Sequence, residues 1–186
     1  MSLKFEVEFL TPFVISSGKA LDGLDHTIDE ETPFPSSAVK GLLRAHALHW
    51  LGLPKTLVGE VFGTARKGSD WIFSDVAVER VGTGSLKHGV EPSLWNRVRV
   101  DENGRAEERA LVAGQQCWAA RGEFTIAWDG RGDSPKLHVL VLRAAARDVV
   151  SIGLNRRRGF GWVTIFDAEP WTDDDSRTLL AVKEES

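Results

Sequence analysis

The chain has 186 residues, 42% of them hydrophobic, which is enough for one globular domain with a full core. Its formal charge of −4 argues against a uniformly basic nucleic-acid binder, and the single Cys117 excludes an internal disulfide framework. No apolar run is long enough to cross a bilayer, and the first residues lack the basic and apolar regions of a signal peptide. We therefore expect a cytoplasmic protein without a membrane partner.

The first half of the chain predicts a strand, a long connection and a helix. Residues 3–10 alternate apolar and charged side chains, which is typical of a half-buried strand. Residues 11–35 lack a hydrophobic period, and connections of this length are often functional or mobile. A helix should begin at Pro35-Ser36-Ser37, capped by a serine hydroxyl, with Lys40 and Arg44 one turn apart on one face.

The second half predicts a matching set of elements. Residues 71–81 alternate like a strand, residues 96–109 read as a hairpin turning at Asn103-Gly104, and residues 112–128 form a long extended segment. A second helix should start near Ser134 and end at Gly153, followed by a last strand over residues 161–166. The fold class is therefore α+β, a single ferredoxin-like or RRM-like βαββαβ domain with inserted loops and a β-hairpin.

Charge is distributed unevenly along this domain and its C-terminal extension. Residues 167–186 hold seven of the 27 acidic side chains but only two of the 23 basic ones, so residues 1–166 are close to neutral. We expect residues 1–166 to form the domain and residues 167–186 a solvated, partly disordered acidic tail. Within the domain, residues 143–158 contain five arginines and a single acid.

Two stretches are suited to binding phosphate. Arg156, Arg157 and Arg158 stand among glycines in the sequence IGLNRRRGFGWV, where glycine permits close backbone approach and the guanidinium forks match phosphate. The start of the first helix, PFPSSAVKGLLR, offers free backbone N–H groups and two nearby bases. A solvated charged turn and an ordinary amphipathic helix are the respective alternatives.

Together these stretches resemble the RAMP superfamily of CRISPR systems. That family joins a ferredoxin-like fold to a C-terminal glycine-rich loop, and its type III backbone subunits open the first helix with a similar serine-containing stretch. TPFPSSAVKGLLRAH (32–46), VFGT (61–64), WIFSDV (71–76) and IGLNRRRGFGWV (152–163) carry the likeness, with Asn155 in place of one loop glycine. The resemblance implies that guide RNA (crRNA), complementary target RNA, other effector subunits and further copies of this chain are partners.

By the same resemblance, a set of residues in the two stretches would contact the sugar-phosphate backbone of the guide. Such contacts position an RNA without reading its sequence. The residues are Ser36, Ser37, Lys40, Arg44, Gly153, Asn155, Arg156, Arg157, Arg158, Gly159, Phe160 and Gly161.

The acidic connection LDGLDHTIDEE raises a separate hypothesis of catalysis. In the type III subunit that cleaves target RNA, an aspartate in this loop is required for metal-dependent cleavage; Asp25 is the matching position here and Asp29 the second choice. Their carboxylates would hold Mg²⁺ beside a scissile phosphate. A solvated acidic loop is the plain alternative. A guide-processing endoribonuclease that uses His26 as a general base is the enzymatic rival, and an interaction module that binds no RNA is the third.

Other motifs leave their alternatives open. His46 and His49 lie three residues apart without a third ligand nearby, so zinc is not expected and His46 should be a partly buried helix residue. The hairpin could act as a thumb inserted between bases or neighbouring subunits, or be an exposed ribbon of mixed charge, with Arg97, Arg99, Arg105 and Arg109 offset by acids. Core packing explains most of the seven tryptophans, although one or two could stack on bases.

Overall fold

The structure is a computed structural model that describes residues 1–19, 21–79, 86–87 and 91–184. Within these residues, β1 (Ser2–Phe9) lies at the heart of an antiparallel sheet. It pairs on one side with β7 (Arg121–Trp128) and on the other with β8 (Val163–Asp167). The alternating sequence of β1 explains this position, because every second residue, from Leu3 to Phe9, is buried on one face while the charged residues remain exposed on the other.

The sheet continues beyond β7 with short strands. β2 (Trp71–Phe73) and β3 (Ala77–Glu79) both pair with β7, and β4 (Leu86–Lys87) pairs with β3. The predicted strand 71–81 is therefore interrupted at residues 74–76, and its residues 80–81 lie outside the described part. At the interruption, the Ser74 hydroxyl donates to the Asp75 carbonyl and accepts from the Thr125 N–H.

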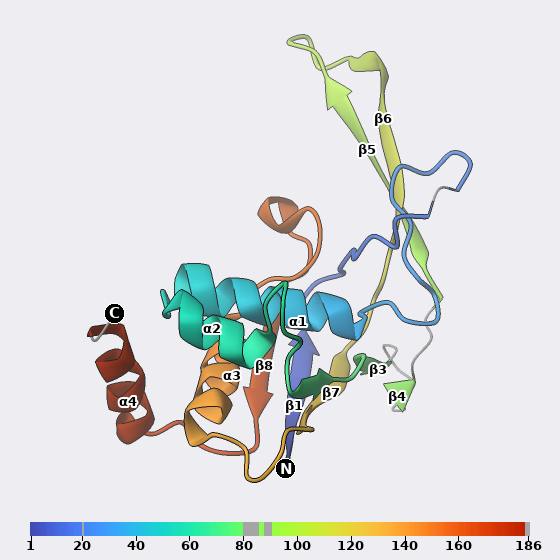
Figure 1. The fold of residues 1–186 in the computed structure, drawn as a ribbon. Helices are drawn as coiled ribbons and strands as arrows, with labels where there is room; N and C mark the ends of the chain where they lie inside the picture. The colour runs from blue at the N-terminus through green and yellow to red at the C-terminus, as the bar shows by residue number, and fades with distance from the viewer. Residues whose placement is uncertain (20, 80–85, 88–90, 185–186) are drawn as a thin grey trace.

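Helices cover one face of this sheet, as Figure 1 shows. α1 (Ser36–Ala45) runs into a π-helical turn at His46–Trp50, followed by α2 (Lys55–Phe62), and α3 (Lys136–Asp148) lies beside them. The core fills the space between helices and sheet; Phe5 stacks on Phe124 with ring centroids 5.0 Å apart. None of the helices in the described residues combines the length and the apolar character needed to cross a membrane.

The order of elements is β1, α1, β2 with β3, β7, α3, β8, and the spatial order of strands is β3-β7-β1-β8. This is the ferredoxin-like arrangement, so the predicted α+β fold is confirmed.

The insertion before β7 is a long hairpin, formed by β5 (Ser93–Val100) and β6 (Ala106–Gln116). It projects far from the helices and the main sheet (Figure 1). The predicted turn is present: Gly104 has a φ of 75°, and the Asp101 carboxylate accepts from the Asn103 and Arg105 N–H groups at 2.9 and 2.8 Å. The strands are longer than the 96–109 segment that the sequence predicted.

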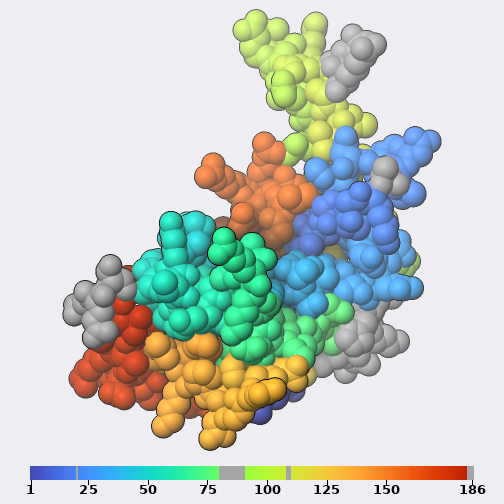
Figure 2. Space-filling model, viewed as in Figure 1, coloured from blue at the N-terminus to red at the C-terminus, as the bar shows by residue number. Residues whose placement is uncertain are grey.

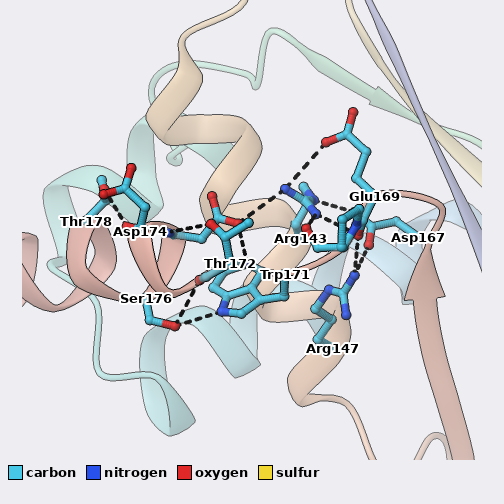
Figure 3. A network of polar contacts seen from close by, with 11 residues as sticks. Arg143, Arg147, Asp167, Glu169, Trp171, Thr172, Asp174, Ser176 and Thr178 are labelled. Carbon is cyan, nitrogen blue, oxygen red and sulfur yellow. Dashed lines mark hydrogen bonds and ion pairs between the residues drawn. The ribbon is translucent and has the colours of Figure 1, made fainter.

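The C-terminal residues differ from the expected tail. Asp167 ends β8, and its side chain is only 7% exposed where it binds Arg143 and Arg147 of α3 (Figure 3). Both guanidinium groups also donate to the carbonyl of Glu169 and lie 5.7 and 5.8 Å from the Trp171 ring. These contacts anchor the helix α4 (Asp173–Glu184) instead of leaving a disordered segment.

Candidate RNA-binding surface

The three consecutive arginines are all exposed. Arg156–Arg158 make a single 3-10 turn, entered through Asn155 in the left-handed conformation (φ 58°) and closed by the Arg158 N–H donating to the Asn155 carbonyl at 2.7 Å. Among the described residues, none of the three arginines has an acidic partner. This arginine turn, orange in Figure 2, stands out from the surface between the helices and the base of the hairpin.

The glycines around the arginine turn have two different roles. Gly153 and Gly161 have positive φ and approach backbone so closely that a Cβ would lie 2.2 Å from the Val14 carbonyl oxygen and 2.0 Å from that of Ile152. Gly159 also has positive φ (84°), but a Cβ there would meet nothing within 4 Å. Gly153 and Gly161 therefore fix the loop against the protein, whereas Gly159 leaves its outer surface open.

Hydrogen bonds secure the ends of this loop to the first connection. The Leu154 N–H donates to the Val14 carbonyl at 2.8 Å, and the Gly161 N–H donates to the Pro12 carbonyl at 2.7 Å. Phe160, predicted as a contact, is half-buried and packs against Trp95 of β5, with ring centroids 5.5 Å apart. The loop is thus a braced structure that presents its arginines outward.

The start of α1 differs from the prediction in one respect. Pro35 occupies the N-cap position and no side chain caps the helix, so the expected serine cap is wrong. The Ser36 N–H instead donates to the carboxylate of Asp75 at 2.7 Å. An anion does lie at this helix terminus, but it is a carboxylate of the protein itself, brought there by the interruption between β2 and β3. The exposed Ser37 remains accessible at the same end of the helix.

The two bases of α1 lie differently in the structure. Lys40 is half-buried, with its ammonium group 5.7 Å from the centre of the Phe73 ring, while Arg44 is exposed one turn further on. Their common side of the helix is accessible, as their spacing predicted.

The structure separates the two candidate catalytic aspartates. Asp25 is exposed, and its Oδ2 accepts from the Ala113 N–H of β6 at 2.9 Å. Asp29 uses Oδ1 for the N–H groups of Glu31 and Thr32, and Oδ2 for Lys19 at 3.2 Å. These contacts hold the pKa of Asp29 below its usual value, first through the Thr32 N–H and then through Lys19.

The metal hypothesis therefore fits one aspartate better than the other. Both oxygens of Asp29 are engaged in shaping the loop, whereas Asp25 Oδ1 has no hydrogen bond to the residues that the structure describes. Among the described residues, no three histidine, cysteine, aspartate or glutamate side chains gather as a metal site. Mg²⁺ is commonly held by one or two carboxylates together with substrate phosphates, a pattern that Asp25 alone could supply.

The first-helix histidines have a structural explanation. His46 was predicted to be partly buried and is buried in the structure; its Nδ1 lies 2.7 Å from Asp148 Oδ2 of α3, while His49 is exposed. His46 thus ties the π-helical turn to α3.

The only cysteine of the chain, Cys117, is buried, which raises the pKa of its thiol to about 12.

The base of the hairpin lies beside the predicted contact residues of the arginine turn. Trp95 and Arg97 of β5 line a small cleft together with Asn155, Arg158 and Phe160. Further along the hairpin, Arg99 pairs with Glu107 at 3.4 Å, and Arg105 is exposed near the tip. The arginines of β5 are visible in the sequence. Their position beside the arginine turn could not be predicted, because it depends on packing between segments that are far apart in the chain.

These features define a ferredoxin-like domain with a projecting hairpin and a braced, exposed basic turn. The family model described as "RAMP superfamily" matches residues 6–164, and the chain therefore belongs to that superfamily. The search of curated proteins gave no match.

Solved structures give the same fold. One similar chain comes from the "Cryo-EM structure of the Type III-B Cmr-beta bound to cognate target RNA", with a TM-score of 0.65, 10% identity and coverage of 90% of this chain and 97% of that one. Another comes from the "Type III-B Cmr-beta Cryo-EM structure of the Apo state", with a TM-score of 0.66, 10% identity and coverage of 91% and 98%. At such low identity the likeness concerns the fold.

Proposed function

We propose that this protein is an RNA-binding subunit of a type III CRISPR effector complex that holds the sugar-phosphate backbone of a guide RNA. The observation that carries the proposal is the arginine turn, with three exposed guanidinium groups that have no acidic partner among the described residues. Because Gly153 and Gly161 fix the loop, its backbone should lose little conformational entropy on binding. Ser37, Lys40 and Arg44 would extend the same contact along α1.

The proposed partners are complementary target RNA, other effector subunits and further copies of this chain. The similar chain in the Cmr-beta structure belongs to an assembly described as bound to cognate target RNA, which supports complementary target RNA and other effector subunits as partners here. The hairpin supports contacts with neighbouring subunits or further copies of this chain, because it carries large exposed apolar side chains along a projecting ribbon. These are Leu94, Val98, Val100 and Leu111.

The decisive experiment replaces Arg156, Arg157 and Arg158 by alanine and measures single-stranded RNA binding over a range of salt concentrations. Each phosphate contact contributes about −0.7 to the slope of log K against log salt, so the slope should become shallower by roughly 2. Affinity should fall alike for unrelated RNA sequences, because backbone contacts carry no sequence information.

A matched control removes three exposed arginines elsewhere: Arg121, Arg131 and Arg177. The net charge changes equally, but the slope should change far less. If both triple variants weaken binding to the same extent, the arginine turn is not a specific RNA contact. A loss confined to one RNA sequence would indicate base reading by the turn.

A second candidate function, cleavage of the target RNA, rests on Asp25. The side chain is exposed and oriented by the Ala113 N–H at 2.9 Å, so one carboxylate oxygen can meet a Mg²⁺ ion carried by the scissile phosphate. When bound, the metal would polarise the phosphate and activate water. Asp25 would hold the ion, and the hydrogen bond to β6 would keep the carboxylate oriented.

The assembled complex with Mg²⁺ should cut complementary RNA, and Asp25→Asn should reduce the cleavage rate by about a hundredfold or more while RNA binding persists. Asp29→Asn provides the control, since its carboxylate is engaged in the loop. Unchanged cleavage in Asp25→Asn would remove the catalytic assignment. Cleavage of repeat RNA in EDTA by the isolated protein would instead favour guide processing with His26 as base.

A further inference from the structure

A groove lies between the C-terminal helix α4 and the helices against which it packs. Its volume is about 620 Å³, within the range of about 300–1,000 Å³ that is usual for binding clefts. Three parts of the chain line it: the π-helical turn with the residues after it, the end of α3, and the segment 171–183. The family model matches residues 6–164, so the α4 wall lies outside the matched part of the chain.

The groove is mainly apolar, and two of its large side chains are exposed. Leu53 and Leu179 are buried, whereas Trp50 and Leu180 are 75% and 57% exposed. The Trp50 ring stacks on His46 with ring centroids 6.0 Å apart, which restricts its position. Tryptophan is among the residues that contribute most to binding energy at protein interfaces, so the groove is suited to receive an apolar side chain.

One face of α4 forms a wall of the groove. The lining residues are spaced as on one side of a helix, and they are Ser176, Leu179, Leu180 and Lys183. The acids of the first turn, Asp173–Asp175, do not line the groove. Although α4 begins with three acids, its groove face is therefore apolar and ends in a base.

Two basic groups of the groove have room for an acceptor. Lys183 is exposed and has no ion pair with the residues that the structure describes. Arg147 binds Asp167 and a backbone carbonyl through Nη2, while its Nε has no partner in the described part of the chain. The acid at the groove, Asp148, already has its Oδ2 2.7 Å from His46 Nδ1. A carboxylate therefore complements this groove better than a base does.

We propose that the groove docks a segment of another protein that presents an apolar side chain next to a carboxylate. The apolar side chain packs against Trp50 and Leu180, and the carboxylate lies toward Lys183 and the Arg147 guanidinium. Figure 1 shows α4 and the projecting hairpin at opposite ends of the molecule. Docking at this groove is therefore separate from RNA binding, and neither requires the other.

The test titrates the nitrogen-15-labelled protein with three acetylated and amidated tetrapeptides: Leu-Glu-Leu-Leu and its glutamine and lysine counterparts. NMR follows the indole N–H signal of Trp50 and the backbone amide signals of α4. The glutamate peptide should shift these signals and bind roughly fivefold more tightly than the glutamine peptide, because it alone forms an ion pair with Lys183. The lysine peptide should bind most weakly, since Lys183 repels it.

Substitutions at the groove separate its apolar and charged contacts. Trp50→Ala should weaken all three peptides about tenfold, and Leu180→Ala should weaken them by a smaller common factor. Lys183→Met should remove the preference for the glutamate peptide over the glutamine peptide. Lys136→Met is the matched control, because it removes the same charge from an exposed position at the start of α3 and should retain the preference.

Crosslinking identifies the occupant in the purified effector complex. Leu180 is replaced by the photoreactive residue benzoylphenylalanine and the complex is irradiated. The crosslink should join α4 to a subunit segment in which an apolar residue neighbours an aspartate or glutamate. A crosslink to a basic segment would contradict the proposed chemistry of the partner.

Three further outcomes would overturn the inference in different ways. If the glutamate and glutamine peptides bind equally well, the groove takes an apolar segment and the carboxylate has no role. If the protein alone self-associates and Trp50→Ala abolishes the association, a second copy occupies the groove. If no peptide shifts the groove signals, the docking site fails. RNA binding, measured separately with the arginine-turn variant, is independent of all three results.

Discussion

Two groups of arginines lie within one basic stretch, residues 143–158, and they serve opposite purposes. Arg143 is buried and Arg147 is half-buried, and Asp167 at the end of β8 binds both of them. Arg156–Arg158 are exposed and have no acidic partner among the described residues. The difference is whether a carboxylate from a later element reaches the guanidinium.

The comparison predicts that the two groups control different properties. The buried group should determine stability, because removing one partner of a buried ion pair leaves an uncompensated charge. The exposed group should determine RNA affinity and contribute little to folding, since exposed charges add little to stability.

Asp167→Asn should have the largest effect on stability and tests the role of the buried ion pair most directly. The variant removes the buried carboxylate that binds Arg143, whose side chain is 6% exposed, and should lower the free energy of unfolding by about 3–5 kcal/mol. Urea denaturation followed by circular dichroism measures the loss. RNA affinity of the folded fraction should remain that of the wild type.

Glu169→Gln is the matched control for that experiment. Its carboxylate lies 3.5 Å from Arg143 but is 69% exposed, so the same network loses a charge at a cost below about 1 kcal/mol. If both substitutions lower the free energy of unfolding by the same small amount, the ion pairs of Asp167 do not contribute to stability as a buried pair should.

A second comparison concerns the frame that holds the exposed arginines. Gly153→Ala and Gly159→Ala both force a β-carbon into the left-handed region, at about 1–2 kcal/mol. Gly153→Ala adds a clash 2.2 Å from the Val14 carbonyl oxygen and should cost a further 1–3 kcal/mol or so. Thermal or urea unfolding measures the difference in stability between the two variants.

The two glycine variants should also differ in their affinity for RNA. Gly159→Ala leaves the loop in place and should retain affinity, whereas Gly153→Ala displaces the arginine turn and should lose it. Identical losses of stability and affinity in the two variants would mean that the loop is not braced against residues 12–14.

Local patterns predicted much of this molecule, including the alternation of β1, the Asn103-Gly104 turn and the charged loop before β8. They could not predict that Asp75 occupies the start of α1, since that contact crosses 39 residues and depends on where β2 stops. The contact between Asp25 and Ala113, across 88 residues, is of the same kind. The site could be outlined from sequence, but its hydrogen-bond partners depend on packing.

The C-terminal helix is a different case, because a local signal did exist. The Thr172 hydroxyl accepts from the Asp175 N–H at 3.2 Å and the Asp175 carboxylate accepts from the Thr172 N–H at 2.9 Å, which is a capping box. Three acids in the first turn of α4 also favour a helix start. Net charge suggested a disordered tail, whereas the order of residues 172–175 indicated a helix.

The smallest predicted effect tests whether the buried arginines depend on this cap. Thr172→Ala should cost about 1 kcal/mol, and hydrogen exchange should show the loss in α4. The Thr172 N–H, followed by its hydroxyl, lowers the pKa of Asp175 below 3.8. The carboxylate therefore stabilises the fold above the unfolded-state pKa, and this contribution disappears as the pH falls through the lower folded-state value.

Below pH 3.8, protonation of Asp175 should make the first turn of the wild-type α4 fray. Asp175→Asn keeps an acceptor for the Thr172 N–H but does not titrate, so this variant should not show the acid-dependent fraying. Thr172→Ala should shift the fraying to higher pH, because the Asp175 pKa returns toward its ordinary value. If α4 frays in either variant while α3 exchanges as slowly as in the wild type, then Asp167 alone is sufficient to hold Arg143 and Arg147. Faster exchange in α3 as well would mean that the buried arginines and α4 form one cooperative unit, distinct from the arginine turn.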